Sequence, residues 1–501
     1  MKRKQGVEDS YYNKLKEEIK KFENINGVIS FAKLHYINFK REHRAKIFNE
    51  SILDRQFCLG KFGFSLRLSI DLSYIFISYE TKFRRRFIEY KFNLEKEKEI
   101  FICIVEKIYE LDWSKQVGIS NFEEHDHRRY FNYKYDYPFI HAYEYFELFK
   151  YFDRLCEDIY GISIYKNFSK LIFLLGPTQN LYIKNMILKK EFSNVKNLFL
   201  DCNSIKETSF IEEDLRNMFN GKLGIKFYDG LYVPRTYHIL ENIFRGIVED
   251  DKSNKEKGDI LEIYSKDIIR KFFRNIYHTS YDNKGNEQDL IIEFEDKILF
   301  VECKAQNFKS IFVEGKNADQ IREEHFKEVI VKGCKQCQRG KEYLLNNKTA
   351  IYYDSNSKKV RKKTLELNRI NNKKVFKIVV ILDDYLDLAE LSNRYLEDEH
   401  RDTWVVNIFA LHRILWTSNK IKGMETFFDY LEYRTQNNLG IESLHCDELA
   451  QFGYWISPNY SIYPKLDMNI NIILRNSFTN IFNEYDYYCK EELQKGLQTY
   501  I

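Results

Sequence analysis

The sequence predicts an α/β protein whose central part is a sheet covered by helices. Two apolar runs joined by a short turn, 289–294 and 298–304, are typical of paired strands, and helical patterns lie on both sides of them. A continuous apolar run at 375–382 has the character of a strand buried on both faces. Helices that alternate with strands in this way favour a sheet flanked by helices.

Composition limits the kinds of protein that this chain can be. Its 501 residues include many charged and aromatic side chains and few prolines or glycines, which is typical of a folded protein with more than one domain. The net charge is only +4, so a nucleic-acid-binding surface would have to be local. Nine cysteines without regular spacing indicate reduced thiols. Because we find no secretory signal and no apolar run of about 18 residues, we expect a cytoplasmic protein with no membrane partner.

Three regions are expected along the chain. Residues 1–248 mix helical and strand patterns, which predicts an α+β region that senses a signal, forms dimers or recognises DNA. A polar segment at 249–258 separates it from an α/β module at 255–385. Residues 386–501 are rich in aromatic side chains and predict a mainly helical C-terminal extension.

The first helix of the module is expected to begin near Asp259. Its apolar residues recur at helical spacing and form one stripe, and Glu262 lies at the edge of that stripe. This helix therefore brings one carboxylate to the margin of the surface that it buries.

The two apolar runs carry the residues with the clearest chemical meaning. Asp289 opens the first run, and Glu302 and Lys304 close the second. Because side chains alternate along a strand, Glu302 and Lys304 point to the same face. Phosphodiester hydrolysis requires an activated water molecule and charge stabilisation, and a hard divalent cation held by carboxylates supplies both. We therefore expect Asp289 and Glu302 to bind the metal, and Lys304 to orient or activate the attacking water molecule and stabilise negative charge.

The second helix of the module is expected over 319–345. Gly333, Gln336, Gly340 and Tyr343 lie on one face at three- and four-residue spacing. Two glycines on one face let a helix approach a sheet closely.

This order of elements resembles the PD-(D/E)xK nucleases, the superfamily of restriction-endonuclease-like phosphodiesterases. The resemblance covers 255–385 and depends on Asp289, Glu302 and Lys304, with twelve residues between the two acids. The residue before the first acid is Gln288, where the superfamily's name implies proline. The resemblance implies a restriction-endonuclease-like core and a phosphodiesterase that acts on DNA with Mg²⁺, or Mn²⁺, as cofactor.

The resemblance also implies roles for residues outside the hairpin. Glu262 corresponds to a helical carboxylate that adds to the metal site. Gln336 corresponds to a glutamine that supports catalysis, with Tyr343 as its aromatic partner. Gln338 is the alternative to Gln336.

Two further features have competing interpretations. Residues 331–375 contain thirteen lysines and arginines against three acids, and the densest group is Lys358, Lys359, Arg361, Lys362 and Lys363. This segment would attract a phosphate backbone, and the alternative is a solubilising loop. Cys334 and Cys337 have the spacing of half a zinc site, but helical packing explains them without a metal.

The expected function is a metal-dependent DNA endonuclease in restriction-like or anti-phage defence. The alternatives are a repair or recombination nuclease that acts on ends or junctions, and a nucleic-acid-binding subunit with a vestigial nuclease fold. Cutting two strands takes two sites, so a homo-oligomer is expected. The glycine-rich phosphate-binding motifs are absent from the sequence, so any nucleotide energy would come from a separate activator or ATPase partner.

Overall fold

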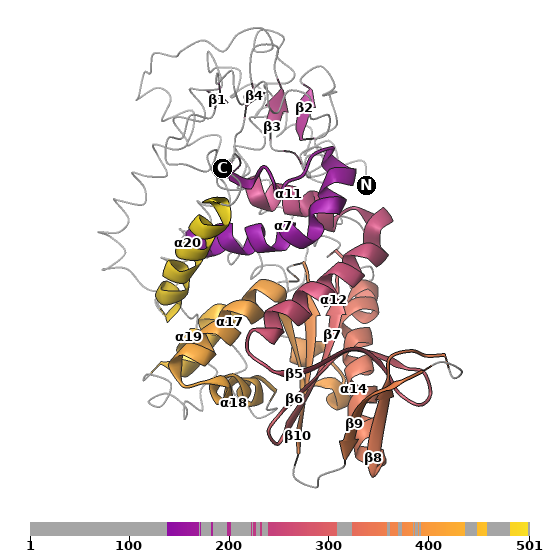
Figure 1. Ribbon diagram of the computed structural model, residues 1–501. Coiled ribbons are helices and arrows are strands. Elements are labelled where there is room, and N and C mark those ends of the chain that lie inside the picture. Colours follow the sequence, from indigo (N-terminus) through magenta and orange to yellow (C-terminus); the bar gives the residue numbers. More distant parts are fainter. Residues whose placement is uncertain are drawn as a thin grey trace, which may run out of the picture. The chain divides into compact units, whose positions relative to one another are not determined.

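The computed structural model describes two compact units of the chain (Figure 1). One unit is formed by 1–135 and 156–247, and the other by 136–155 and 248–501. The described residues are 138–169, 171, 182–183, 198–201, 222, 224–226, 231–232, 239–307, 323–357, 361–368, 373–383, 385, 389, 392–435, 448–457 and 481–498.

The first unit contains a small four-stranded sheet. Its strands are β1 (Tyr182–Ile183), β2 (Phe199–Asp201), β3 (Gly224–Lys226) and β4 (Leu231–Tyr232), in the order β1-β4-β3-β2. Strands β2 and β3 are parallel, and β4 is antiparallel to both of its neighbours. Helix α11 (Ile239–Val248) follows, so the described part of this region contains both helix and strand.

The second unit is built on a mixed seven-stranded sheet in the order β11-β10-β7-β6-β5-β8-β9. Its strands are β5 (Asn275–Tyr281), β6 (Glu287–Phe294), β7 (Lys297–Lys304), β8 (Thr349–Tyr353), β9 (Lys363–Asn368), β10 (Lys374–Ile381) and β11 (Thr403–Asn407). The β5-β6-β7 meander and the β8–β9 hairpin are antiparallel, whereas β10 runs parallel to β7 and to β11. The predicted α/β class, with a sheet flanked by helices, is confirmed.

The predicted hairpin and the predicted buried strand form the centre of the sheet. β6 and β7 pair around a turn at Glu295, which adopts φ 51°, and β10 lies on the other side of β7. Their apolar side chains are almost completely buried, including Ile291, Phe300 and Val380. Burying one such side chain contributes about 1.5–3 kcal/mol, so these strands account for much of the core.

Four strands of this sheet were not predicted. β5 carries several half-buried polar residues, and β9 alternates exposed charged residues with buried leucines, so neither has a long apolar run. β8 and β9 lie within the basic segment 331–375, for which the sequence indicated a phosphate-binding surface or a solubilising loop. β11 lies in the region 386–501, which was expected to be mainly helical, and it extends the same sheet.

Helices cover both faces of the sheet (Figure 1). Phe300 faces α14 (Lys332–Asn346), where its ring lies against Gly340. Cys303 points to the other face, where it meets Ser265 of α12 (Asn254–Arg270). α14 follows a π-helical turn at Lys327–Val331.

The chain after β11 is helical in its described parts. The second unit also contains α16 (Ser392–Tyr395), α17 (Ile408–Ile421), α18 (Met424–Thr435), α19 (Glu448–Ile456) and α20 (Asn483–Gln498). Helix α7 (Pro138–Tyr160) belongs to the second unit up to Leu155 and to the first unit from Cys156 onward. α17 begins at Asn407, whose side chain accepts a hydrogen bond from the backbone N–H of Phe409. It ends before Gly423, which adopts φ 86° and allows the chain to turn into α18.

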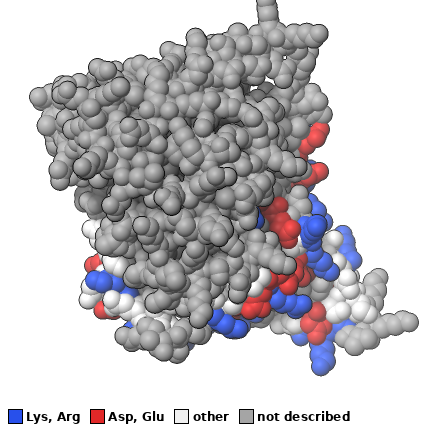
Figure 2. Space-filling view, turned by 90° about the horizontal axis from the view of Figure 1, so that it is seen from above, with Lys and Arg blue, Asp and Glu red and all other residues white. Residues whose placement is uncertain are grey.

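Charges are interspersed on the described part of the surface that Figure 2 shows, without a broad field of one sign. This agrees with the net charge of +4 and requires any polyanion to be bound locally. No helix among the described residues is long and apolar enough to cross a membrane.

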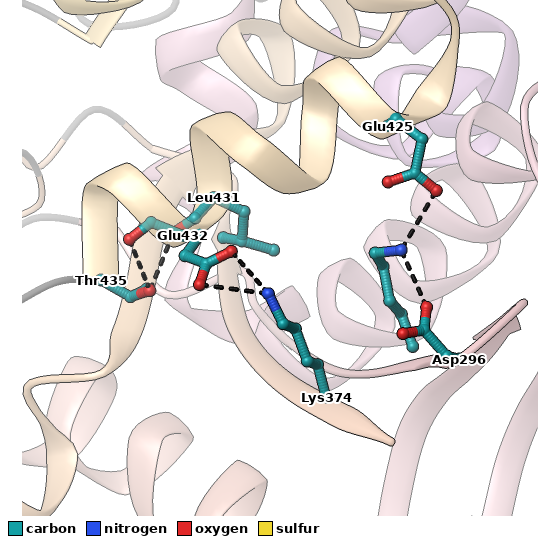
Figure 3. A network of polar contacts seen from close by, with 7 residues as sticks. Asp296, Lys374, Glu425, Leu431, Glu432 and Thr435 are labelled. Carbon is teal, nitrogen blue, oxygen red and sulfur yellow. Dashed lines mark hydrogen bonds and ion pairs between the residues drawn. The ribbon is translucent and has the colours of Figure 1, made fainter. Parts of the chain in front are cut away.

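Helix α18 is tied to the starting ends of β7 and β10 by ion pairs (Figure 3). Lys297 Nζ lies 3.1 Å from Glu425 Oε1 and 2.9 Å from Asp296 Oδ1. Lys374, which pairs with Lys297 across the sheet, places its Nζ 3.0 Å from Glu432 Oε2. These contacts lie at the start of β7, whereas Glu302 and Lys304 lie at its other end.

Candidate metal-dependent active site

Asp289 and Glu302 lie where the two central strands separate. The pairing of β6 with β7 runs from Phe294↔Lys297 to Leu290↔Val301 and stops one residue short of both acids. The backbone N–H of Cys303 donates a hydrogen bond of 2.7 Å to Asp289 Oδ2. The structure therefore brings the two predicted acids together at the end of the hairpin.

Glu302 is a fully buried carboxylate with a donor on each oxygen. Gln288 Nε2 donates to Oε1, and Lys304 Nζ donates to Oε2 at 3.2 Å. Burial and then the neighbouring Asp289 carboxylate raise the pKa of Glu302 well above its usual range, and Lys304 opposes this shift. Burial of this carboxylate therefore works against its ionisation in the absence of a cation.

The pKa of Asp289 is also shifted. Its pKa is raised to about 6, mainly by burial and to a smaller extent by Glu262, although Lys304 and the Cys303 N–H act in the opposite direction. For Lys304, burial lowers the pKa, but the carboxylates of Glu302 and Asp289 outweigh that effect and raise it. The lysine is therefore an ammonium at neutral pH.

Glu262 reaches the margin of the site from α12. Its carboxylate is near enough to raise the pKa of Asp289, and its Oε2 lies 3.7 Å from His278 Nε2 on β5. Both side chains are partly exposed. His278 was missed in the sequence because a lone histidine in a polar strand gives no signal until the fold places it beside an acid.

The backbone opposite Asp289 is strained. Thr279 adopts φ 47°, and the pairing of β5 with β6 includes His278↔Leu290 and Ser280↔Gln288 but omits the residue pair between them. A β-branched residue in this conformation is an outlier that costs about 1–3 kcal/mol. Such strain often occurs at functional sites, and here it lies directly across from a predicted ligand.

The two glycines of α14 let this helix approach the sheet closely, as the sequence predicted. A Cβ at Gly333 would lie 3.0 Å from the methyl groups of Val379 and 3.2 Å from Cε of Lys304. A Cβ at Gly340 would overlap the Oε1 of Gln288 and lie 2.9 Å from the Phe300 ring. A larger residue at either position would push the helix away from the acids.

The other residues predicted on α14 make different contacts. Gln336 Oε1 is buried without a hydrogen-bond partner in the described part of the chain, and no contact joins Gln336 to either acid there. Gln338 instead accepts a hydrogen bond of 2.6 Å from Lys377 Nζ. Tyr343 donates to the carbonyl oxygen of Ile351 at 3.1 Å and so supports β8.

Cys334 and Cys337 are fully buried thiols on the face of α14 that packs on the sheet. Cys337 Sγ lies 3.4 Å from the carbonyl oxygen of Ile378. Both cysteines therefore occupy core positions, in agreement with the packing interpretation.

A different group of potential ligands was not predicted. Ligand atoms of Glu397, Glu399 and His400 all lie within 4.8 Å of one another. Glu262, Asp289 and Glu302 do not form a group this compact in the described residues. The signal for the unpredicted group was a Glu-x-Glu-His sequence, which is too short to distinguish from an exposed polar turn.

The predicted basic segment lies at the β8–β9 hairpin. The Arg361 guanidinium lies 3.9 Å from the centre of the Tyr353 ring. Tyr353 pairs with Tyr281 on β5, and the Tyr281 hydroxyl donates to Glu287 Oε1 at 3.0 Å. In the densest basic group of this segment, Arg361, Lys362 and Lys363 are described, whereas Lys358 and Lys359 lie outside the described residues.

Comparison of the chain with models of protein families, with curated proteins and with solved structures gives no match. The interpretation of the site therefore depends on its geometry and chemistry.

Proposed function

We propose that this protein is a metal-dependent nuclease that hydrolyses DNA phosphodiester bonds, with a restriction-endonuclease-like core. The observation that carries the proposal is the buried pair of Asp289 and Glu302, with Lys304 beside it. Burial and the neighbouring Asp289 carboxylate disfavour ionisation of Glu302, and a divalent cation held by both acids would remove that penalty.

The donor set suits a hard cation. Asp289 uses Oδ2 for the Cys303 N–H, which leaves Oδ1 as a ligand atom. Bound by Asp289 and Glu302, Mg²⁺ or Mn²⁺ would polarise the scissile phosphate and lower the pKa of a water molecule. Glu262 is the third carboxylate in electrostatic range, and Mg²⁺ commonly keeps water molecules between itself and such a group.

The positive charge of Lys304 limits the role that it can have in catalysis. Its pKa is raised by Glu302 and Asp289, so it carries its proton at neutral pH. A charged ammonium cannot remove a proton from water, so Lys304 would orient the attacking water molecule and stabilise negative charge on the phosphoryl oxygens.

The β8–β9 hairpin is the proposed contact for the DNA backbone. Arg361, Lys362 and Lys363 lie at its tip, and Tyr353 and Tyr281 link the tip to the strand beside the acids. Cations next to half-exposed aromatic rings suit a phosphate backbone with adjacent bases. A homo-oligomer would supply a second site for the second strand.

Plasmid cleavage tests the proposed activity. We expect the full chain to nick or linearise plasmid DNA in the presence of Mg²⁺ or Mn²⁺, and EDTA to stop the reaction. Cleavage that persists in EDTA would contradict the assignment. So would a preparation that binds Mn²⁺ but leaves plasmid, single-stranded DNA and branched DNA intact.

Neutralising the hairpin should weaken DNA binding without changing the chemistry. In the double variant Lys362→Ala/Lys363→Ala, we expect the slope of log Kd against log salt to fall by about 2, because each phosphate contact contributes roughly 0.9. Fluorescence anisotropy with a labelled duplex measures this slope. Lys420→Ala/Lys422→Ala removes two exposed charges from the end of α17 and is the matched control. Equal slopes for the two double variants would exclude the hairpin as the contact.

A further inference from the structure

Gln288 connects the proposed metal site to the helix that covers it. It lies on β6 next to Asp289, is 2 % exposed, and donates from Nε2 to Glu302 Oε1. The ionised form of Glu302, which is the form that would bind a cation, only accepts hydrogen bonds, so in that state the NH₂ group of the amide faces Glu302. The amide oxygen consequently points away from the acid, toward Gly340 of α14.

Gly340 provides the space that this arrangement needs. A Cβ at this position would overlap the amide oxygen of Gln288 and press on the ring of Phe300. Phe300 belongs to the fully buried centre of β7 and cannot move freely. The amide of Gln288 is therefore confined between a helix backbone and the acid.

Glu302 has side-chain donors from two different strands. Gln288 on β6 holds Oε1, and Lys304 on β7 holds Oε2 at 3.2 Å, while the backbone of Asp289 also donates to this carboxylate. Without Gln288, the buried carboxylate would lose one of its two side-chain donors and would be held less firmly in this orientation.

We propose that Gln288 is a positioning residue that holds Glu302 in its metal-binding orientation, and that Gly340 is required to keep the Gln288 amide in place. This inference rests on the proposed function, because it assigns Glu302 to a metal. Gln288 itself would not touch the metal or the substrate. Its effect would reach them through the orientation of the carboxylate.

The test is direct Mn²⁺ binding by isothermal titration calorimetry, with thermal unfolding as the measure of folding. We expect Gln288→Met, which keeps the length of the side chain and removes the donor, to weaken Mn²⁺ binding by about 10–100-fold, the usual effect of losing an outer partner of a ligand. Gly340→Ala should weaken binding similarly. The double variant should lose less Mn²⁺ binding free energy than the sum of the losses in the two single variants, because both substitutions act on one amide.

Gln338→Met is the matched control. Gln338 is another glutamine at the interface between α14 and the sheet, but its amide oxygen accepts from Lys377. Its loss should lower the unfolding temperature and leave Mn²⁺ affinity unchanged. Equal loss of Mn²⁺ affinity in Gln338→Met and Gln288→Met would mean that general loosening of the interface is the cause, and it would overturn the proposal.

Asp289→Asn distinguishes a failure of the role proposed for Gln288 from a failure of the proposed function. Suppose that the wild type binds Mn²⁺ and that Asp289→Asn does not. If Gln288→Met and Gly340→Ala then bind Mn²⁺ as tightly as the wild type, the metal site is supported and the role of Gln288 is overturned. If the wild type binds no Mn²⁺, or if Asp289→Asn binds as tightly as the wild type, then the proposed function fails, and the role of Gln288 fails with it. If Gln288→Met does not fold, Gly340→Ala decides the result alone.

Discussion

Asp289→Asn should lose metal-dependent DNA cleavage by about 10³-fold, because a carboxylate ligand to a catalytic cation supports several kcal/mol of transition-state stabilisation. The substitution is nearly isosteric, and the amide oxygen can still accept from the Cys303 N–H. The fold should therefore persist. Plasmid cleavage under saturating Mg²⁺ measures the loss.

The same variant should be more stable than the wild type at neutral pH in the absence of metal. Folding raises the pKa of Asp289 from 3.8 to about 6, so its contribution to stability is fully present below pH 3.8 and is lost as the pH rises through 6. Replacing it with a neutral amide should recover up to about 3 kcal/mol at pH 7.5. Urea unfolding in EDTA across pH 4 to 8 should show the wild type losing stability relative to Asp289→Asn.

Activity and stability should thus change in opposite directions. A residue with a purely structural role would lose both together. Cleavage by Asp289→Asn at the wild-type rate would remove this residue from the site. A variant that is less stable than the wild type at pH 7.5 would contradict the electrostatic account of its burial.

Lys304→Met should lower the cleavage rate by about 10²–10³-fold, the usual cost of removing a group that stabilises charge in a transition state. It should also move metal binding to higher pH. Lys304 lowers the pKa of Asp289, so its removal leaves the acid protonated over a wider range, and a protonated acid binds metal poorly. Cleavage rates and Mn²⁺ affinities measured from pH 6 to 9 would show both effects.

Lys377→Met is the matched control for this variant. Lys377 is a fully buried lysine on the neighbouring strand, where its ammonium pairs with Asp402. Removing it should destabilise the protein, although Asp402 is partly exposed and keeps its ion pair with Lys341, and cleavage by the folded fraction should persist. If the two lysine variants lose cleavage equally, the effect of Lys304 belongs to folding and not to chemistry.

The sequence predicted the centre of the sheet because its signals there are local. The apolar strands, the acids at their ends and the glycine spacing of α14 all lie within one element each, and periodicity reports such features directly. The close approach of α14 at Gly333 and Gly340 follows the prediction for this reason.

Other parts of the site depend on contacts between distant segments. Gln288 was noted in the sequence only because it is not proline, whereas its role as a donor requires β7 and α14 beside it. His278 has meaning only next to Glu262. The helical spacing also could not show that Cys337 faces the centre of the sheet and that Gln336, one residue away, lies toward the edge of the buried face.

The edge strand β9 was not predicted because it is largely exposed. β9 presents charged side chains at alternate positions, because one face of it is covered and the other is open to solvent. This pattern is expected of an edge strand, where charge discourages pairing with other chains. On its own, it is hard to distinguish from a polar loop.

β7 places a lysine at each end, and the two lysines face carboxylates of very different exposure. Lys297 at the start of the strand is 12 % exposed, and its partners Glu425 and Asp296 are 49 % and 58 % exposed, so water can solvate these carboxylates if the lysine is replaced. Lys304 at the other end pairs with Glu302, which has no exposure, so water cannot take the place of its ammonium. A neutral residue is therefore expected to be tolerated better at the start of this strand than at its end.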